Sequence, residues 1–390
     1  MVQLLKSAHT ALASILDFWM ERTPDPEGGF IGRMDADNKI VPGAPKGAVL
    51  NARILWTFSA AFRANNGEAY RQMADRAYHY FRDHFVDPVH GGVFWSVDAE
   101  GRPLDTKKQI YAIAFAIYGL SEYYAATGHP TALETAIRLY RDIEQRSFDE
   151  RRGGYLEAFS RDWGRAGDMR LSAKDANEAK TMNTHLHILE AYTNLYRVWK
   201  DPYLERQLRA LVQVFRRHII DPVSYHLILF FDEDWNPRSK TISFGHDIEA
   251  SWLLCEAAVV LGLDVNTEAM QIAVAAREGL AVDGSMYNEY DDGHWNRERH
   301  WWVQAEAMVG FVNAWQISGE PAYFEDFERT WTYIDRFVID HLGGEWRWGL
   351  KEDNTPMPGE DKVGMWKGPY HNGRALMELI RRLDPGGDRV

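Results

Sequence analysis

Three histidines stand in predicted helices with mostly apolar neighbours, and each is a candidate for acid–base chemistry. Around one of them, His246, Glu249 and Trp252 recur at every third position, so the three side chains share one helix face. Buried imidazole and carboxylate groups need polar partners, because an unpaired buried polar group is costly. The stretch therefore fits either a structural histidine hydrogen-bonded in the core or one part of a reactive site.

Another helix start, Lys46 to Phe58, carries Arg53 among apolar neighbours. An arginine in such surroundings calls for a core carboxylate or an anionic ligand. The segment from Trp366 to His371 packs Gly, Pro, Trp, Tyr, His and Asn into a junction between a loop and a helix. Function tends to gather in such loops, so this segment is hard to explain by structure alone.

Two further pairs of polar and aromatic residues stand four residues apart. Asn183 and His187 share one helix face, and Trp302 and Glu306 share another. The structural alternatives are a hydrogen bond between helices for His187, core packing for Trp302 and a solvated position for Glu306. If the helix starts meet at one rim, these groups converge with the others on one pocket.

Three reaction classes use such a set. A metal site is conceivable because His246 and Glu249 have ligand spacing, but Arg53 disfavours a cation and no HExxH motif is present. An inverting glycosidase needs two opposed carboxylates, for which Glu249 and Glu306 are candidates. Proton transfer beside a carbonyl uses the whole set best, with histidines as bases and Arg53 facing the developing oxyanion. Sugar binding without catalysis is a fourth possibility.

The composition of the chain narrows the classes of molecule that it could bind. The chain has 390 residues, 15 Trp, 18 Tyr and 18 Phe, and flat aromatic faces suit the C–H faces of sugars. A net charge of -13 without a basic run argues against nucleic acid and anionic membranes. One cysteine excludes an internal disulfide, and neither a signal peptide nor a long apolar run is evident. We expect a cytoplasmic protein that does not bind membranes.

The hairpins and helices that would position these residues are predicted from a repeat in the sequence. Six segments combine an Asp-containing turn, often followed by Gly-Gly, with alternating aromatic and apolar residues typical of short β-hairpins. Their aspartates are spaced 62, 62, 72, 62 and 57 residues apart and are Asp25, Asp87, Asp149, Asp221, Asp283 and Asp340.

Between the hairpins, helical periodicity predicts paired helices. The predicted ranges are 48–63, 109–126, 133–144, 184–199, 203–217, 248–261, 302–317, 324–338 and 373–383. Six helix pairs favour an all-α, closed (α/α)6 barrel with short β-hairpins at one rim, and an open helical solenoid is the alternative. We expect one catalytic domain over residues 1–390, with a frayed tail at 384–390.

Several motifs in the right order resemble those of the cellobiose 2-epimerases, within the N-acylglucosamine 2-epimerase superfamily. The motifs are Asn51–Ser59, Asn183–Tyr192, Phe244–Trp252, Trp301–Glu306 and Pro369–Arg374. The resemblance runs from about Phe18 to the last predicted helix. It implies an (α/α)6 barrel and epimerisation at C2 of a reducing-end glucose or mannose unit, without metal or other cofactor.

The resemblance also implies roles for individual residues. His246 and His371 would be the acid–base pair at C2, and Arg53 would stabilise a cis-enediolate. His187 would bind near O1 and O5 and assist ring opening, and Glu249 would orient or tune a histidine.

Further positions would bind or surround the sugar. These are Tyr111, Asn183, Glu306 and Asp175 as binding or supporting residues, Trp302 and Trp366 as stacking platforms, and Trp252 behind the site. The implied partner is a small reducing sugar, with cellobiose and lactose as expected substrates. Mannose 2-epimerases and aldose–ketose isomerases of the same superfamily are the alternatives, and we expect a monomer, with a dimer as the alternative.

Overall fold

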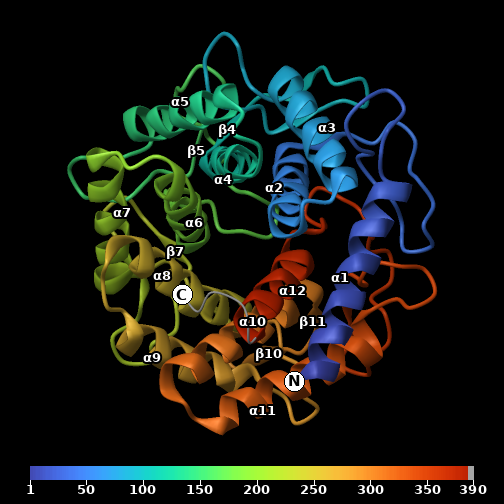
Figure 1. The fold of residues 1–390 in the computed structure, drawn as a ribbon. Helices are drawn as coiled ribbons and strands as arrows, with labels where there is room; N and C mark the ends of the chain where they lie inside the picture. Colours follow the sequence, from blue (N-terminus) through green and yellow to red (C-terminus); the bar gives the residue numbers. More distant parts are fainter. Residues whose placement is uncertain (385–390) are drawn as a thin grey trace.

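Six helices form an inner ring and alternate along the chain with six helices of an outer ring (Figure 1). The computed structural model describes residues 1–384, so the predicted frayed tail lies outside the described residues except for its first residue. The inner helices are α2 (Ala48–Asn65), α4 (Ile110–Thr127), α6 (Met182–Val198), α8 (Phe244–Leu261), α10 (Trp301–Ser318) and α12 (Tyr370–Leu383). The outer helices are α1 (Val2–Arg22), α3 (Glu68–His84), α5 (Pro130–Arg146), α7 (Pro202–Val214), α9 (Asn266–Ala276) and α11 (Pro321–Tyr333).

The ring closes where its last inner helix meets its first. Helix α12 packs against both α2 and α10, and at the rim Met34 forms a β-bridge with Val363. An open solenoid would leave these two ends apart, so the predicted (α/α)6 barrel is confirmed.

Burial explains which helices lie inside. In α2 every residue from Ala48 to Ala61 is buried, as expected for a helix covered on all sides. In α3 only one face is buried, formed by Ala74, Ala77, Tyr78, Tyr80 and Phe81, which is typical of an amphipathic outer helix. Gly119 of α4 allows close packing in the inner ring, because a Cβ there would lie 2.7 Å from the carbonyl oxygen of Ala52.

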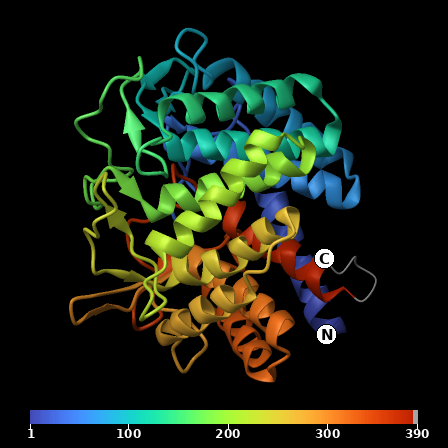
Figure 2. The same cartoon turned by 90° about the vertical axis from the view of Figure 1, so that its left-hand side faces the viewer.

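The six predicted hairpin turns are present, and each is closed by a β-bridge. The bridges join Pro24 to Phe30, Val86 to Val93, Phe148 to Tyr155, Ile220 to Leu227, Leu280 to Met286 and Ile339 to Trp346. The strands gather at one end of the barrel (Figure 2). They are β1 (Lys46–Gly47), β2 (Ser96–Val97), β3 (Pro103–Asp105), β4 (Lys108–Gln109), β5 (Ala158–Phe159), β6 (Lys180–Thr181), β7 (Phe230–Phe231), β8 (Ile242–Ser243), β9 (Glu289–Asp291), β10 (His294–Asn296), β11 (Arg299–His300) and β12 (Gly349–Leu350).

Neighbouring repeats are joined at this rim. Each strand directly before an inner helix from α2 to α10 pairs antiparallel with a strand of the following hairpin, as β1 does with β2 and β4 with β5. Four of the hairpin aspartates also form ion pairs with lysines that follow them in the chain. These pairs are Asp25–Lys46 at 2.7 Å, Asp87–Lys108 at 2.9 Å, Asp149–Lys180 at 2.9 Å and Asp340–Lys362 at 2.6 Å. The rim therefore holds the starts of the inner helices in fixed positions.

Three short helical segments complete the path: η1 (Phe215–Ile219), η2 (Arg277–Gly279) and η3 (Ile334–Val338). Among residues 1–384, no helix combines the length and the apolar character that crossing a bilayer requires.

Candidate active site

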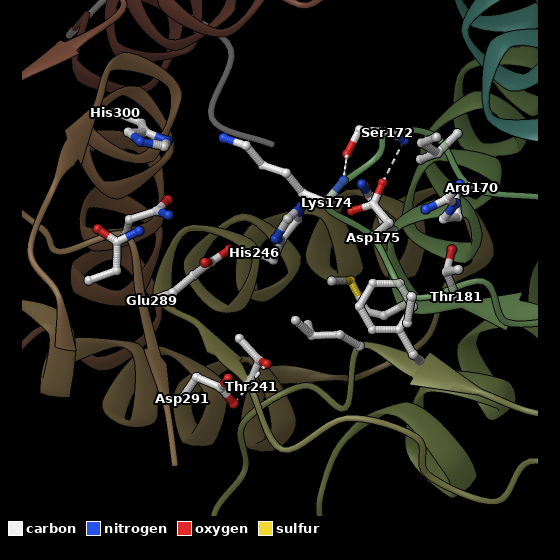
Figure 3. Close-up of a pocket in the computed structure, with 18 of the residues that line it drawn as sticks. Arg170, Ser172, Lys174, Asp175, Thr181, Thr241, His246, Glu289, Asp291 and His300 are labelled. Atoms are coloured by element: carbon white, nitrogen blue, oxygen red, sulfur yellow. Dashed lines mark hydrogen bonds between the residues drawn. The ribbon is translucent and has the colours of Figure 1, made fainter. Parts of the chain in front are cut away.

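A cavity of about 480 Å³ opens at the rim, above the starts of α6, α8 and α10. Four of the predicted site residues line it, namely Asn183, Asp175, His246 and Trp302. Figure 3 shows His246 at its inner wall, with Glu289 and His300 to one side and Asp175 to the other. The remaining predicted residues do not line it, and His371 is connected to it through the ring of Trp302.

The first turn of α8 places His246 at the cavity wall. Its Nδ1 lies 2.7 Å from the hydroxyl of Ser243, the residue that caps the helix. The ring centroid of Trp302 is 4.7 Å from that of the imidazole. Gly245 permits this contact, because a Cβ there would lie 2.6 Å from the indole. Burial lowers the pKa of His246 to about 3, so the imidazole is neutral and able to accept a proton.

His371 lies at the start of α12, and its imidazole contacts the same indole. The ring centroids of His371 and Trp302 are 5.8 Å apart. Its Nδ1 donates to the carboxylate of Glu306 over 2.6 Å, which leaves Nε2 as the basic nitrogen. Burial, followed by the charges of Arg53 and Arg374, lowers the pKa of His371 well below its usual value. Trp302 therefore brings two neutral imidazoles into one neighbourhood.

The third histidine, His187 on α6, is held in the same way by a carboxylate. Its Nδ1 donates to Glu190, one turn further along the helix, over 2.9 Å. The ring of Tyr111 meets it edge-on, with centroids 4.9 Å apart, and the ring of Phe115 lies at 4.7 Å. Burial lowers the pKa of His187, so this imidazole is also neutral in the resting protein.

Arg53 on α2 is a buried cation without a carboxylate partner in the described part of the chain. Its Nη atoms donate to the hydroxyl of Tyr111 over 3.0 Å and to the backbone oxygen of Trp366 over 3.1 Å. Its guanidinium carbon lies 4.4 Å from the ring centroid of Phe115, and its Nε has no hydrogen-bond partner. The alternative of a core ion pair is therefore wrong, and the guanidinium is available to an anionic ligand.

Arg374 on α12 is the opposite case. It donates to Glu249 over 2.8 Å and to Glu306 over 2.6 Å, and it also bonds Glu190. All four groups are buried. Trp252 packs behind them, donating to Glu306 over 3.0 Å, with its ring centroid 4.7 Å from the guanidinium carbon. Trp252 thus lies where the sequence placed it.

Two of the expected roles are redistributed. Glu249, expected to orient a histidine, bonds Arg374, whereas Glu306, expected as a sugar-binding or supporting residue, is the carboxylate that bonds His371. Since Glu306 already accepts from His371, Trp252 and Arg374, its oxygens are occupied. The reason is tertiary: the guanidinium of Arg374 lies between the two glutamates.

The arrangement of Glu249, Glu306 and Arg374 also argues against two of the alternatives, the glycosidase and the metal site. Ligand atoms of Glu249, Glu306 and His371 lie within 4.8 Å of one another and are buried. Glycosidase carboxylates stand on opposite sides of a bond, about 5 to 9.5 Å apart, so this pair cannot flank a sugar. A metal ion would have to displace the guanidinium that already bonds both carboxylates.

The other predicted binding residues fall into two groups. Asn183 and Asp175 line the cavity, and the buried Oδ1 of Asn183 has no hydrogen-bond partner in the described chain. Tyr111 and Trp366 lie deeper, with ring centroids 6.0 Å apart, beside Arg53. The first group can bind sugar hydroxyls, and the second surrounds the cation.

Several residues of the site were not predicted from the sequence: Glu190, Arg374, Tyr370, Ser243 and Glu157. Two of them had a signal, because Glu190 follows His187 by three residues and Arg374 follows His371 by three. Glu157 is a buried carboxylate at the cavity wall that accepts from the hydroxyls of Thr181 and Thr184. Its sequence context gave no such signal.

Comparison with known proteins agrees with this architecture. Residues 29–373 match the N-acylglucosamine 2-epimerase (GlcNAc 2-epimerase) family. The chain is 53% identical to a cellobiose 2-epimerase of Bacteroides fragilis, with 94% of this chain and 95% of that protein covered. It is 40% identical to a cellobiose 2-epimerase of Ruminococcus albus, with 94% and 96% covered.

A solved structure gives the same result. The cellobiose 2-epimerase of Bacillus thermoamylovorans superposes with a TM-score of 0.95 at 39% identity. The superposition covers 98% of this chain and 100% of that one. Sequence and fold therefore agree over almost the whole length, and this chain belongs to the N-acylglucosamine 2-epimerase family.

Proposed function

We propose that the protein is a disaccharide 2-epimerase that interconverts glucose and mannose units at the reducing end of β-1,4-linked disaccharides such as cellobiose. One observation carries the proposal: two neutral imidazoles, His246 and His371, contact the same indole near a buried guanidinium that has no carboxylate partner in the described chain. The names of the relatives, cellobiose 2-epimerases at up to 53% identity, support this substrate class.

The reaction begins with ring opening, which exposes the C1 aldehyde. His187, with its Nδ1 proton held by Glu190, presents Nε2 near O1 and O5 and assists this step. A carbonyl at C1 makes the proton on C2 acidic, because the electrons released at C2 delocalise onto O1.

One of the two imidazoles, His246 or His371, removes the C2 proton. The C2–H electron pair forms a C1–C2 double bond, and O1 takes up the negative charge of a cis-enediolate. Arg53 stabilises this charge in surroundings from which water is largely excluded, where a fixed cation is worth more than in bulk water. Rotation about C2–C3 then presents the other face of C2, and the second imidazole returns a proton there.

The cavity accommodates the rest of the disaccharide. Trp302 presents its indole to the reacting unit, and Asn183 and Asp175 accept hydrogen bonds from sugar hydroxyls at the cavity wall. A volume of about 480 Å³ suits a ligand of this size.

Incubation with cellobiose in D2O tests the proposal directly. We expect glucosyl-mannose with deuterium at C2, detected by chromatography and NMR. Product without deuterium at C2 would exclude deprotonation there. Free glucose would indicate a hydrolase, and glucosyl-fructose as the main product would indicate an aldose–ketose isomerase.

The two imidazoles are tested by His246→Asn and His371→Asn. Each is expected to reduce epimerisation below detection while leaving the circular dichroism spectrum and the melting temperature near those of the parent protein. His185→Asn is a matched control, because His185 is a buried histidine on α6 that bonds backbone groups of Thr181 and Tyr155. Near-normal turnover in either of the first two variants would remove that residue from the proposed pair.

A further inference from the structure

We propose that Arg374 is a positioning residue that fixes the tautomer of His187 and His371 together, through Glu190 and Glu306. The effect that we expect on turnover rests on the proposed function. The effect that we expect on the tautomers of the two histidines does not rest on it.

Among residues 1–384, Arg374 is the one group that bonds both carboxylate partners. Glu190 accepts from His187 and from Arg374, and Glu306 accepts from His371 and from Arg374. The two hydrogen-bonded paths meet at a single guanidinium, which is only 1% exposed. Its Nη1 and Nη2 atoms are both used in these contacts.

The charges in the cluster favour the same tautomer at both histidines. One guanidinium faces three carboxyl groups, so one of the three is best left protonated. Glu306 receives hydrogen bonds from Arg374, Trp252 and His371, whereas Glu249 receives one from Arg374, so the proton belongs on Glu249. Burial and the charge of Glu306 raise the pKa of Glu249 well above its usual value, in agreement with this assignment.

The two remaining groups, Glu190 and Glu306, are then the anions. Burial raises the pKa of Glu306, but the charge of Arg374 and the hydrogen bonds from Arg374 and Trp252 oppose that rise and favour its anion over that of Glu249. Burial opposes ionisation of Glu190, but the charge of Arg374 outweighs it and lowers the pKa of Glu190 to about 2. An anionic carboxylate accepts the Nδ1 proton of the neighbouring imidazole, which leaves Nε2 unprotonated. Without Arg374, both carboxylates lose their shared counter-charge and are more easily protonated, and a protonated carboxyl no longer fixes the tautomer of the imidazole beside it.

The first experiment uses the ligand-free wild-type protein with 15N-labelled histidine. Nitrogen NMR is expected to show protonated Nδ1 and unprotonated Nε2 at His187 and at His371, each assigned from its His→Asn variant. A protonated Nε2 at either residue in the neutral state overturns the proposal. This measurement depends neither on the folding of an Arg374 variant nor on turnover of any sugar.

The second experiment compares Arg374→Lys with Lys108→Met. Lys108 is also fully buried and ion-paired, but its partner is the hairpin residue Asp87. We expect Arg374→Lys to shift the nitrogen signals of both histidines and to lower kcat on cellobiose about 100-fold, with KM changed by less than about threefold. Lys108→Met is expected to lower the melting temperature without moving either histidine signal.

A folded Arg374→Lys variant that shifts neither histidine, or only one, overturns the proposal. Equal shifts in Lys108→Met would also overturn it, since they would follow from loss of stability alone. If the wild-type protein does not epimerise cellobiose, the proposed function fails, and the histidine spectra still test the role of Arg374.

Discussion

Arg53 and Arg374 are buried on neighbouring helices of the inner ring, and both guanidinium groups contact the ring of Tyr370, at 5.0 and 4.3 Å. Each donates to a tyrosine hydroxyl, and the Nε of each has no hydrogen-bond partner among the described residues. The difference lies in the anions: Arg374 bonds three glutamates, whereas the other partner of Arg53 is a backbone carbonyl.

The difference separates a structural role, that of Arg374, from the catalytic role proposed for Arg53. Removing a buried cation from its carboxylates leaves charges that burial penalises, so Arg374 is needed for the folded arrangement. A buried cation without a carboxylate costs free energy in the resting protein and recovers it when an anion arrives. In the proposed reaction, Arg53 would match a charge that appears only during turnover, which is where a stabilising interaction accelerates a step.

The largest expected effect is on stability. Arg374→Met should lower the free energy of unfolding by about 3 to 5 kcal/mol, because the buried anions of Glu190 and Glu306 lose their counter-charge and Glu249 loses its hydrogen-bond donor. Urea denaturation followed by tryptophan fluorescence measures this. A loss below about 1 kcal/mol would show that the glutamates share protons among themselves without needing the guanidinium.

Arg53→Met should show the reverse pattern. We expect kcat on cellobiose to fall about 10²- to 10³-fold, as for loss of an oxyanion donor. The free energy of unfolding should stay within about 1 kcal/mol of the parent value, since no described carboxylate loses a partner. The same denaturation curves and a steady-state assay measure both quantities. A large loss of stability would mean that Arg53 has a structural partner and would remove the contrast.

The pH dependence of stability should reveal the neutral histidines. The pKa of His246 is lowered from 6.5 to about 3 by burial, so the unfolded chain binds a proton that the folded protein excludes. Stability is complete above pH 6.5 and falls as the pH drops toward 3. Between pH 8 and pH 5, the free energy of unfolding of His246→Asn should therefore fall by about 1 to 2 kcal/mol less than that of the parent protein. Parallel curves for the two proteins would show that folding does not lower the pKa of His246.

The smallest expected effect concerns substrate binding. Trp302→Leu should raise KM for cellobiose about tenfold, because it removes an aromatic face from the cavity wall. The adjacent Trp301 is the matched control: it is buried and packs on Trp348, with ring centroids 4.6 Å apart. Trp301→Leu should reduce stability and leave KM near the parent value. Equal KM values for the two variants would argue against an indole at the sugar.

The architecture was largely predictable because hairpins and apolar helices repeat at similar spacing. All nine predicted helices are present, with ends shifted by up to about one turn. Helices α1, α3 and α9 were not among the predicted ranges. The buried stripe of α3 consists mostly of Ala and Tyr, and α9 is short and rich in Ala, so both patterns are weak.

The site was predictable only as far as local spacing and resemblance reach. His246 and Trp302 were expected at the pocket and line it. The partner of Glu249 was not predictable, because Arg374 lies 125 residues away in the chain. Which carboxylate bonds which histidine depends on how α12 meets α8 and α10 across the ring, and helical periodicity holds no information on that.

The ion pairs between hairpin aspartates and lysines break the pseudo-symmetry of the rim. Ile242 replaces the lysine just before α8, and before α10 the equivalent Arg299 bonds the hydroxyl of Ser285. These two helices carry His246 and Trp302, which line the cavity. Other bonds take their place in this sector: Asp247 of α8 bonds His226 and accepts from the backbone N–H of Leu227, and Gln304 of α10 bonds the backbone of Met286. The part of the rim that carries the cavity is therefore fastened by side chains of the inner helices themselves.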